Sequence, residues 1–110
     1  MEGLKRVTQP TLDVLTVLLS AEEDLHGFGV AKQTGRAPGT VYPILRKLED
    51  GGYLEGRWEQ EAPAEGRPRR RYYRLTVAGR AEATELLHAR ASAVPHLRPQ
   101  LGESFAWGIE

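Results

Sequence analysis

Residues 39–48 read "GTVYPILRKL", a stretch with helical periodicity and a proline inside it. The apolar residues recur at i, i+3, i+4 and i+7, the spacing of one helix face: Val41, Ile44, Leu45 and Leu48. A proline costs about 3 kcal/mol in a helix interior, because it lacks an N–H and its ring meets the carbonyl four residues back. That cost is smaller near the first turn, where backbone N–H groups have no intrahelical partner. We therefore expect a helix over about 38–50 whose beginning is stiffened by Pro43.

Two more helices are predicted upstream of this one. Thr8 is placed to cap the first, with Pro10 in its opening turn, and its apolar stripe comprises Leu12, Leu15, Leu18 and Leu19. The second covers about 28–34 and stops at Gly35, and its inward candidates are Phe28, Val30 and Ala31. A tight turn joins the second and third helices, which predicts a helix-turn-helix.

The apolar period changes from 3.6 to 2 after the third helix. In "YLEGRWEQ" (53–60) one face carries Leu54, Gly56 and Trp58, and in "RRYYRLT" (70–76) Tyr73 and Leu75 share a face. We expect two antiparallel strands joined by the loop 61–70. Trp58 is expected in the core, with the wall of a small-molecule pocket as the alternative.

Thr76 is placed to cap a last helix over about 77–93. Its expected apolar side is Val77, Ala81, Leu87, Ala91 and Val94, and Leu86 and Leu87 are expected to be exposed in a monomer. The predicted fold class is α+β, mostly α: a winged helix-turn-helix of three helices and a two-stranded β-wing over 8–76, then a C-terminal helix over 77–94. A loosely ordered tail is expected over 95–110, where the proline-broken sequence has little periodicity.

Composition excludes several classes of protein. The 110 residues suffice for one small domain, and the absence of cysteine excludes disulfides, thiolate metal sites and thiol-based redox sensing. The longest strongly apolar run, "VLTVLL" (14–19), is too short to span a bilayer, and the first ten residues lack the apolar core of a signal peptide. We expect a cytoplasmic protein with no membrane partner.

Charge is unevenly distributed although the formal net charge is zero. Five arginines and no acidic residue lie in the segment 67–74, while acidic residues gather at 22–24 and at Glu59, Glu61 and Glu65. The planar guanidinium pairs well with phosphate and suits narrow minor grooves. This distribution predicts a basic wing that contacts DNA; a merely solubilising loop is the alternative.

No pattern of catalytic or metal-binding residues is present in the sequence. His26, His88 and His96 lack the spacing of a metal site, and there is neither a nucleophile elbow nor a phosphate-binding loop. We expect no enzymatic activity, no cofactor and no metal.

The segment from about Leu12 to Leu87 resembles the PadR-like family of transcriptional regulators. The resemblance rests on Gly27 with Phe28, on the run 39–43, on the spacing of Leu45, Leu48, Gly52 and Leu54, and on "YYRLT" with Gly79. It implies a homodimeric DNA-binding protein, in most members a repressor. The third helix would enter the major groove, the wing would touch the flanking backbone or minor groove, and the C-terminal helix would build the dimer. The chain departs from the family pattern at Pro38 and in its short C-terminal region.

The pattern and the resemblance together predict two sets of site residues. The predicted DNA-binding residues are Pro38, Gly39, Thr40, Tyr42, Pro43, Arg46, Lys47, Arg67, Arg69, Arg70, Arg71 and Tyr72. The predicted dimerisation residues are Leu86, Leu87, Ala91 and Val94.

Some alternatives stay open at the level of sequence. Tyr42 either reaches a base edge or phosphate or packs on the second helix, and Trp107 is either a dimer anchor or loosely held. The alternative function is a winged helix that binds an acidic protein partner. A small-molecule effector of unidentified class is a further partner that the sequence neither requires nor excludes.

Overall fold

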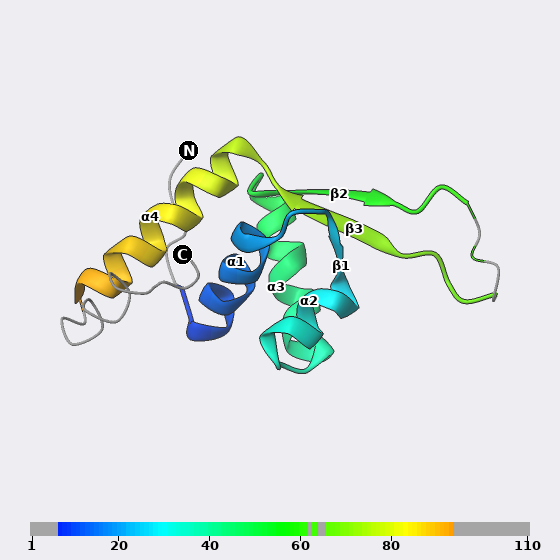
Figure 1. Cartoon of the computed structure of the whole chain (residues 1–110), viewed down its shortest axis with the longest axis horizontal. Helices are drawn as coiled ribbons and strands as arrows, with labels where there is room; N and C mark the ends of the chain where they lie inside the picture. Colours follow the sequence, from blue (N-terminus) through cyan, green and yellow to red (C-terminus); the bar gives the residue numbers. More distant parts are fainter. Residues whose placement is uncertain (1–6, 62, 64–65, 94–110) are drawn as a thin grey trace.

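The computed structural model describes residues 7–61, 63 and 66–93. The elements follow the chain in the order α1 (Gln9–Ser20), β1 (Leu25–His26), α2 (Gly27–Thr34), α3 (Pro38–Asp50), β2 (Leu54–Trp58), β3 (Arg71–Leu75) and α4 (Val77–Ala93). Figure 1 shows α1, α2 and α3 gathered below the sheet, with the β2–β3 ribbon extending to one side and α4 leaving on the other. No helix in the described ranges is long and apolar enough to cross a membrane.

The core lies where the three helices meet the inner half of the sheet. Thr8 caps α1 through its side chain, as predicted, and Gly35 ends α2 in the left-handed conformation at φ 73°. The predicted stripe of α3 is buried at Val41, Leu45 and Leu48. The largest fully buried side chains are Leu15, Leu45, Leu48, Val14, Val30 and Val41.

The two predicted wing strands are present as the antiparallel pair β2 and β3, and the sheet contains a third strand, β1, that the sequence did not predict. The strand order is β1-β3-β2, with β3 in the centre, and Leu25 and His26 pair with Tyr73 and Tyr72. A strand of two residues is too short to show an alternating pattern, and in the sequence it was part of the connection after α1. This extra strand fastens the beginning of α2 to the wing.

Two aromatic residues predicted to point inward are exposed instead. Trp58 is 58% exposed because it lies on the part of the ribbon that extends past the helices (Figure 1). Phe28 is 56% exposed because the buried stripe of α2 begins one residue earlier, at Gly27, and continues through Val30 and Ala31.

The first turn of α4 is fixed to the end of α3. The Thr76 hydroxyl accepts from the Gly79 N–H at 2.9 Å, as predicted for a cap, and donates to the Gly52 carbonyl at 2.7 Å. A Cβ at Gly79 would lie 1.9 Å from the Tyr53 carbonyl oxygen, so only glycine allows this approach. The helix therefore leaves the domain in a fixed direction.

The inward face of α4 differs from the one predicted. Val77 is 90% exposed and Ala81 is exposed, whereas Ala83 is fully buried. Leu86 packs partly buried against the core, and Leu87 is half-buried, so neither is fully exposed in the single chain. The reason is that α4 packs against α1 before it leaves the domain (Figure 1). Val94 and Trp107 lie outside the described residues.

Candidate nucleic-acid interface

The beginning of α3 is exposed and carries no side-chain cap. Pro38 is the first helical residue, and Ala37 at the N-cap position makes no side-chain hydrogen bond. The Thr40 and Val41 N–H groups donate to the Ala37 carbonyl at 2.9 and 3.1 Å. The helix is held in place by Arg36, whose guanidinium forms an ion pair with Asp13 of α1 at 2.8 Å. The first turn of α3 therefore faces solvent, and the residues that precede it are tied to α1.

Pro43 is the sixth residue of α3 and lies just beyond the first turn. Because it has no N–H, the Gly39 carbonyl lacks its usual partner four residues on. Gly39, Thr40 and Pro43 are all exposed, and a Cβ at Gly39 would meet nothing within 4 Å. The acceptor freed by the proline is thus on a surface that water or a ligand reaches, which explains why the helix tolerates it.

Tyr42 packs on the second helix, which is one of the two interpretations that the sequence left open. Its ring packs on α2 so closely that a Cβ at Gly27 would lie 2.3 Å from Cε1. The side chain is nevertheless 45% exposed. One face of the ring is thus held by α2 and the other is presented to solvent beside Arg46 and Lys47, which are also exposed.

The wing arginines are not an uninterrupted positive surface. Three of the five form ion pairs with glutamates that lie elsewhere in the sequence: Arg67 with Glu59 at 3.0 Å, Arg74 with Glu55 at 3.3 Å, and Arg71 with Glu49. Reading the run 67–74 alone missed these acids, because each lies across the ribbon or on α3. The spacing of residues on paired strands is the signal that would have found Glu55.

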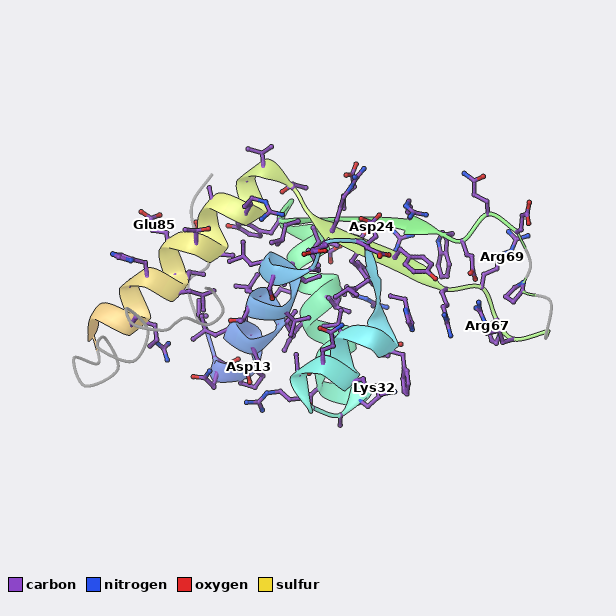
Figure 2. The ribbon with its side chains drawn as sticks, viewed as in Figure 1. Asp13, Asp24, Lys32, Arg67, Arg69 and Glu85 are labelled. Atoms are coloured by element: carbon purple, nitrogen blue, oxygen red, sulfur yellow. The ribbon has the colours of Figure 1, made fainter. Side chains whose placement is uncertain are left out.

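Arg69 and Arg70 differ from the other wing arginines. Within the described ranges neither side chain forms an ion pair, although the Arg70 N–H donates to Glu59 at 3.1 Å. Figure 2 shows Arg69, with Arg67, at the end of the ribbon furthest from the helices. The Glu59 carboxylate accepts from both Arg67 and the Arg70 backbone, and the Arg67 hydrogen bond is the main reason why the pKa of Glu59 is lowered.

A hollow of about 640 Å³ lies between the helices and the wing. It brings together some of the predicted residues, namely Tyr42, Arg46, Arg67, Arg69, Arg70 and Arg71. It also contains His26, Phe28 and Glu49, which sequence reasoning did not assign to a site, and Trp58, for which a pocket wall was the alternative interpretation. Lys47 and Pro43 line a shallower depression of about 480 Å³ on α3, which shares Tyr42 and Arg46 with the hollow. The two concavities together follow the exposed face of α3 onto the wing.

His26 forms one wall of this hollow. Its ring meets the ring of Tyr72 edge-on, with centroids 5.7 Å apart. Burial lowers the pKa of His26, and the positive charges of Arg70 and Arg67 lower it further against the opposing effect of Glu59. The imidazole is therefore held toward its neutral form by neighbours that are themselves suited to bind anions.

Tyr72 lies outside the hollow, unlike the other wing residues of the prediction. Strand alternation turns it away from Tyr73, and the Arg57 guanidinium lies 5.3 Å from its ring centroid. Arg57 in turn pairs with Asp24 at 3.2 Å. Pro38, Gly39 and Thr40 also lie outside the hollow, on the exposed end of α3.

An exposed second helix of a helix-turn-helix, with an antiparallel ribbon projecting beside it, defines the class of winged helix-turn-helix proteins. Comparison with known proteins identifies the family within this class. Residues 14–85 match the model of the transcriptional regulator PadR-like family. The chain belongs to this family, as the sequence pattern predicted.

Individual relatives agree with this assignment. The transcriptional regulator Rv3488 of Mycobacterium tuberculosis is 38% identical over 71 residues, which is 60% of this chain and 63%, or less than two thirds, of that relative. A PadR family transcription regulator from Clostridium difficile R20291 matches with a TM-score of 0.61 and 26% identity, over 81% of this chain and 95% of that one. Bacillus subtilis PadR, solved in complex with operator DNA, matches with a TM-score of 0.58 and 22% identity, over 70% and 45% of the two chains.

Proposed function

We propose that this chain is a sequence-specific DNA-binding regulator that places α3 in the major groove and the wing on the flanking DNA. The observation that carries the proposal is the hollow, because it joins the exposed face of α3 to Arg69 and Arg70, the two wing arginines that form no ion pair with any described residue. A sugar–phosphate strand between a major and a minor groove carries the negative charge that Arg69 and Arg70 would bind. DNA binding as such is supported by B. subtilis PadR, which has a similar fold and was solved in complex with operator DNA.

Within this arrangement the side chains take different roles. Thr40 and Tyr42 are placed to contact base edges or a phosphate, and Arg46 and Lys47 to contact the backbone or a guanine edge. Arg69 and Arg70 bind phosphates at the flank or enter the minor groove. Pro43 stiffens the end of the helix, so that less conformational freedom is lost on docking.

We further propose that the chain acts as a cytoplasmic homodimeric repressor on an inverted repeat. The C-terminal helix would build the dimer through Leu87, Ala91 and Val94, with Leu86 shared between that contact and the core of its own chain. The two copies of α3 would then read half-sites about one helical turn apart.

A selection from random-sequence duplexes at moderate salt tests the proposal. We expect enrichment of an inverted repeat whose spacing gives the distance between the two copies of α3. Enrichment of a single half-site would retain DNA recognition but contradict the dimer. No enrichment with a folded protein would contradict the proposal as a whole.

The ion pairs of the wing favour one competing function, a winged helix that binds another protein. They leave fewer uncompensated charges than the sequence suggested, and Asp50 adds an acid beside Lys47 on α3. Substituting Arg69 and Arg70 with glutamine separates the two functions. If the wing binds DNA, the affinity and its salt dependence both fall; an unchanged DNA affinity would favour a protein partner.

A further inference from the structure

The face of the β2–β3 ribbon that is turned toward the helices changes character along its length. Three cross-strand pairs share it: Leu54 with Leu75, Gly56 with Tyr73, and Trp58 with Arg71. Leu54, Leu75 and Tyr73 are buried, whereas Trp58 is exposed. Apolar packing against the helices therefore ends about halfway along the ribbon. Something other than apolar burial has to fix the angle of the outer half.

The Arg71 side chain makes the connection at this point. Its Nη2 donates to Glu49 Oε2 on α3, and its guanidinium carbon lies 5.2 Å from the ring centroid of Trp58. The two partners of the ion pair are only 27% and 28% exposed. In the described part of the chain this is the one ion pair that joins the ribbon to α3. It links the element proposed to read the major groove directly to the wing.

Gly56 provides the space through which Arg71 reaches α3. A Cβ at Gly56 would lie 2.8 Å from Nε of Arg71 and 2.9 Å from its Cζ and Nη2. Any larger residue at this position would push the guanidinium away from Glu49. The displaced atoms are the far end of a flexible side chain, so the backbone need not move.

We propose that Arg71 is a positioning residue, which with Glu49 and Gly56 fixes the angle between the wing and α3, and that it does not contact DNA itself. The inference rests on the proposed DNA-binding function and replaces the direct DNA contact predicted for Arg71 from the sequence. A guanidinium neutralised by a carboxylate adds little to phosphate binding. Direct phosphate contact by the wing then belongs to Arg69 and Arg70, which the Glu49–Arg71 pair holds at the right distance from α3.

Glu49→Gln is the decisive variant, because the two roles of Arg71 predict different effects of this substitution on DNA affinity. If Arg71 positions the wing, losing the ion pair weakens binding to the selected duplex roughly tenfold, even though a negative charge has been removed. If Arg71 contacts phosphate, removing its competitor leaves the affinity unchanged or raises it. The slope of log affinity against log salt stays at the wild-type value in the first case, because the wing still reaches the same phosphates and the loss comes from ordering a wing whose angle is no longer fixed.

A shortened duplex adds a readout that general damage to the fold would not produce. Trimming the flanks so that the wing has no DNA to touch removes the contacts that depend on the wing angle. On this duplex we expect Glu49→Gln and the wild-type protein to bind equally. A defect of the same size on both duplexes would indicate damage to α3 and overturn the inference.

Arg71→Gln, Gly56→Ala and the double variant Glu49→Gln/Arg71→Gln complete the test. We expect Gly56→Ala to reproduce the loss with both charged groups still present. The double variant should lose about as much DNA affinity as the single variant that binds more weakly. The two single losses should not multiply, because the pair acts as one unit. The Glu55–Arg74 pair is the matched control: it lies on the same strands without touching α3, so Glu55→Gln and Arg74→Gln should change affinity less than about twofold.

Besides an equal defect on both duplexes, two results would overturn the inference alone while DNA binding by the wild-type protein stands. One is an unchanged or higher affinity of Glu49→Gln; the other is a salt slope of Arg71→Gln that is smaller by about 0.9, the value for one lost phosphate contact. Failure of the wild-type protein to select any duplex would instead overturn the proposed function, and the inference with it.

Discussion

The exposed face of α3 and the wing both present cationic side chains next to aromatic rings, yet they hold their charges differently. On α3, Arg46 and Lys47 are exposed and form no ion pair within the described residues. On the wing, three of five arginines are paired with Glu49, Glu55 and Glu59. A run of positive residues in the sequence is thus not a continuous positive surface, because paired strands bring acids from elsewhere beside it.

On the α3 side of this comparison, the largest effect is expected for a substitution at Gly27. A Cβ there would lie 2.3 Å from the ring of Tyr42, so Gly27→Ala has to displace the ring or shift α2. We expect a loss of about 1–3 kcal/mol in the free energy of unfolding, together with weaker DNA binding. Chemical denaturation measures the first and titration of the selected duplex the second.

Gly39→Ala is the matched control for this variant, because its Cβ would meet nothing within 4 Å. Alanine also has a higher helix propensity than glycine, by about 0.8–1 kcal/mol in a helix interior. We expect unchanged or slightly higher stability. Equal destabilisation by the two substitutions would contradict the close packing of Tyr42 on α2.

On the wing side of the comparison, the double substitution Arg69→Gln/Arg70→Gln should weaken DNA binding and reduce its salt dependence. Each phosphate contact contributes about 0.9 to the salt slope, so losing both should lower the slope by about 1.8 and the affinity by roughly tenfold or more. Arg74→Gln removes the same kind of charge from a residue that is already paired. An equal effect of Arg74→Gln would contradict the distinction between paired and unpaired wing arginines.

A pH titration of DNA binding tests His26, which lines the hollow between α3 and the wing. Burial and the charges of Arg70 and Arg67 lower the pKa of His26 in the free protein. A phosphate strand in the hollow offsets the arginine charges and raises that pKa, so the complex takes up a proton. Affinity should therefore rise a few-fold as the pH falls below about 6.5, and His26→Gln should abolish most of this dependence.

The same lowered pKa has the opposite effect on folding. The unfolded chain binds a proton at His26 more readily than the folded chain, so stability falls as the pH drops below the ordinary value of 6.5. Each pH point thus needs a check that the protein is folded. His88→Gln, on the exposed surface of α4, is the control and should leave the pH dependence of DNA binding unchanged.

A small effect is expected for Glu59→Gln, next to the outer end of β2. Glu59 accepts hydrogen bonds from Arg67 and the Arg70 backbone, and all of these contacts lie within the wing. We expect nearly unchanged thermal stability and an affinity within about threefold of wild type, since none of these contacts joins the wing to α3. A loss as large as that of Glu49→Gln would show that the wing is fixed at Glu59 and not at the Glu49–Arg71 pair.

The sequence predicted those features that depend on local pattern. Helical and strand periodicity predicted the bounds of α3 and α4 and the placement of Tyr73 and Tyr72 on opposite faces of β3. Capping preference predicted the caps at Thr8 and Thr76. Family membership followed from several such motifs in order.

What the sequence did not predict depends on where the elements lie relative to one another. Trp58 lies on the same face of β2 as the buried Leu54, but at a point where the ribbon extends past the helices. The strand at Leu25 exists only because β3 lies beside it. The partners of Arg67, Arg71 and Arg74 are separated from them by 8, 22 and 19 residues, distances that only the folded ribbon and α3 bring together.

Hydroxyl-radical footprinting of the selected duplex tests the central claim most directly, namely that α3 and the wing bind one half-site across a shared hollow. With the wild-type protein we predict protection of the deoxyriboses next to the bases read by α3 and a second protected patch on the adjacent flank. Arg69→Gln/Arg70→Gln should erase the flanking patch and leave the first in place. Identical footprints for the two proteins, or a wild-type footprint without a flanking patch, would contradict the account.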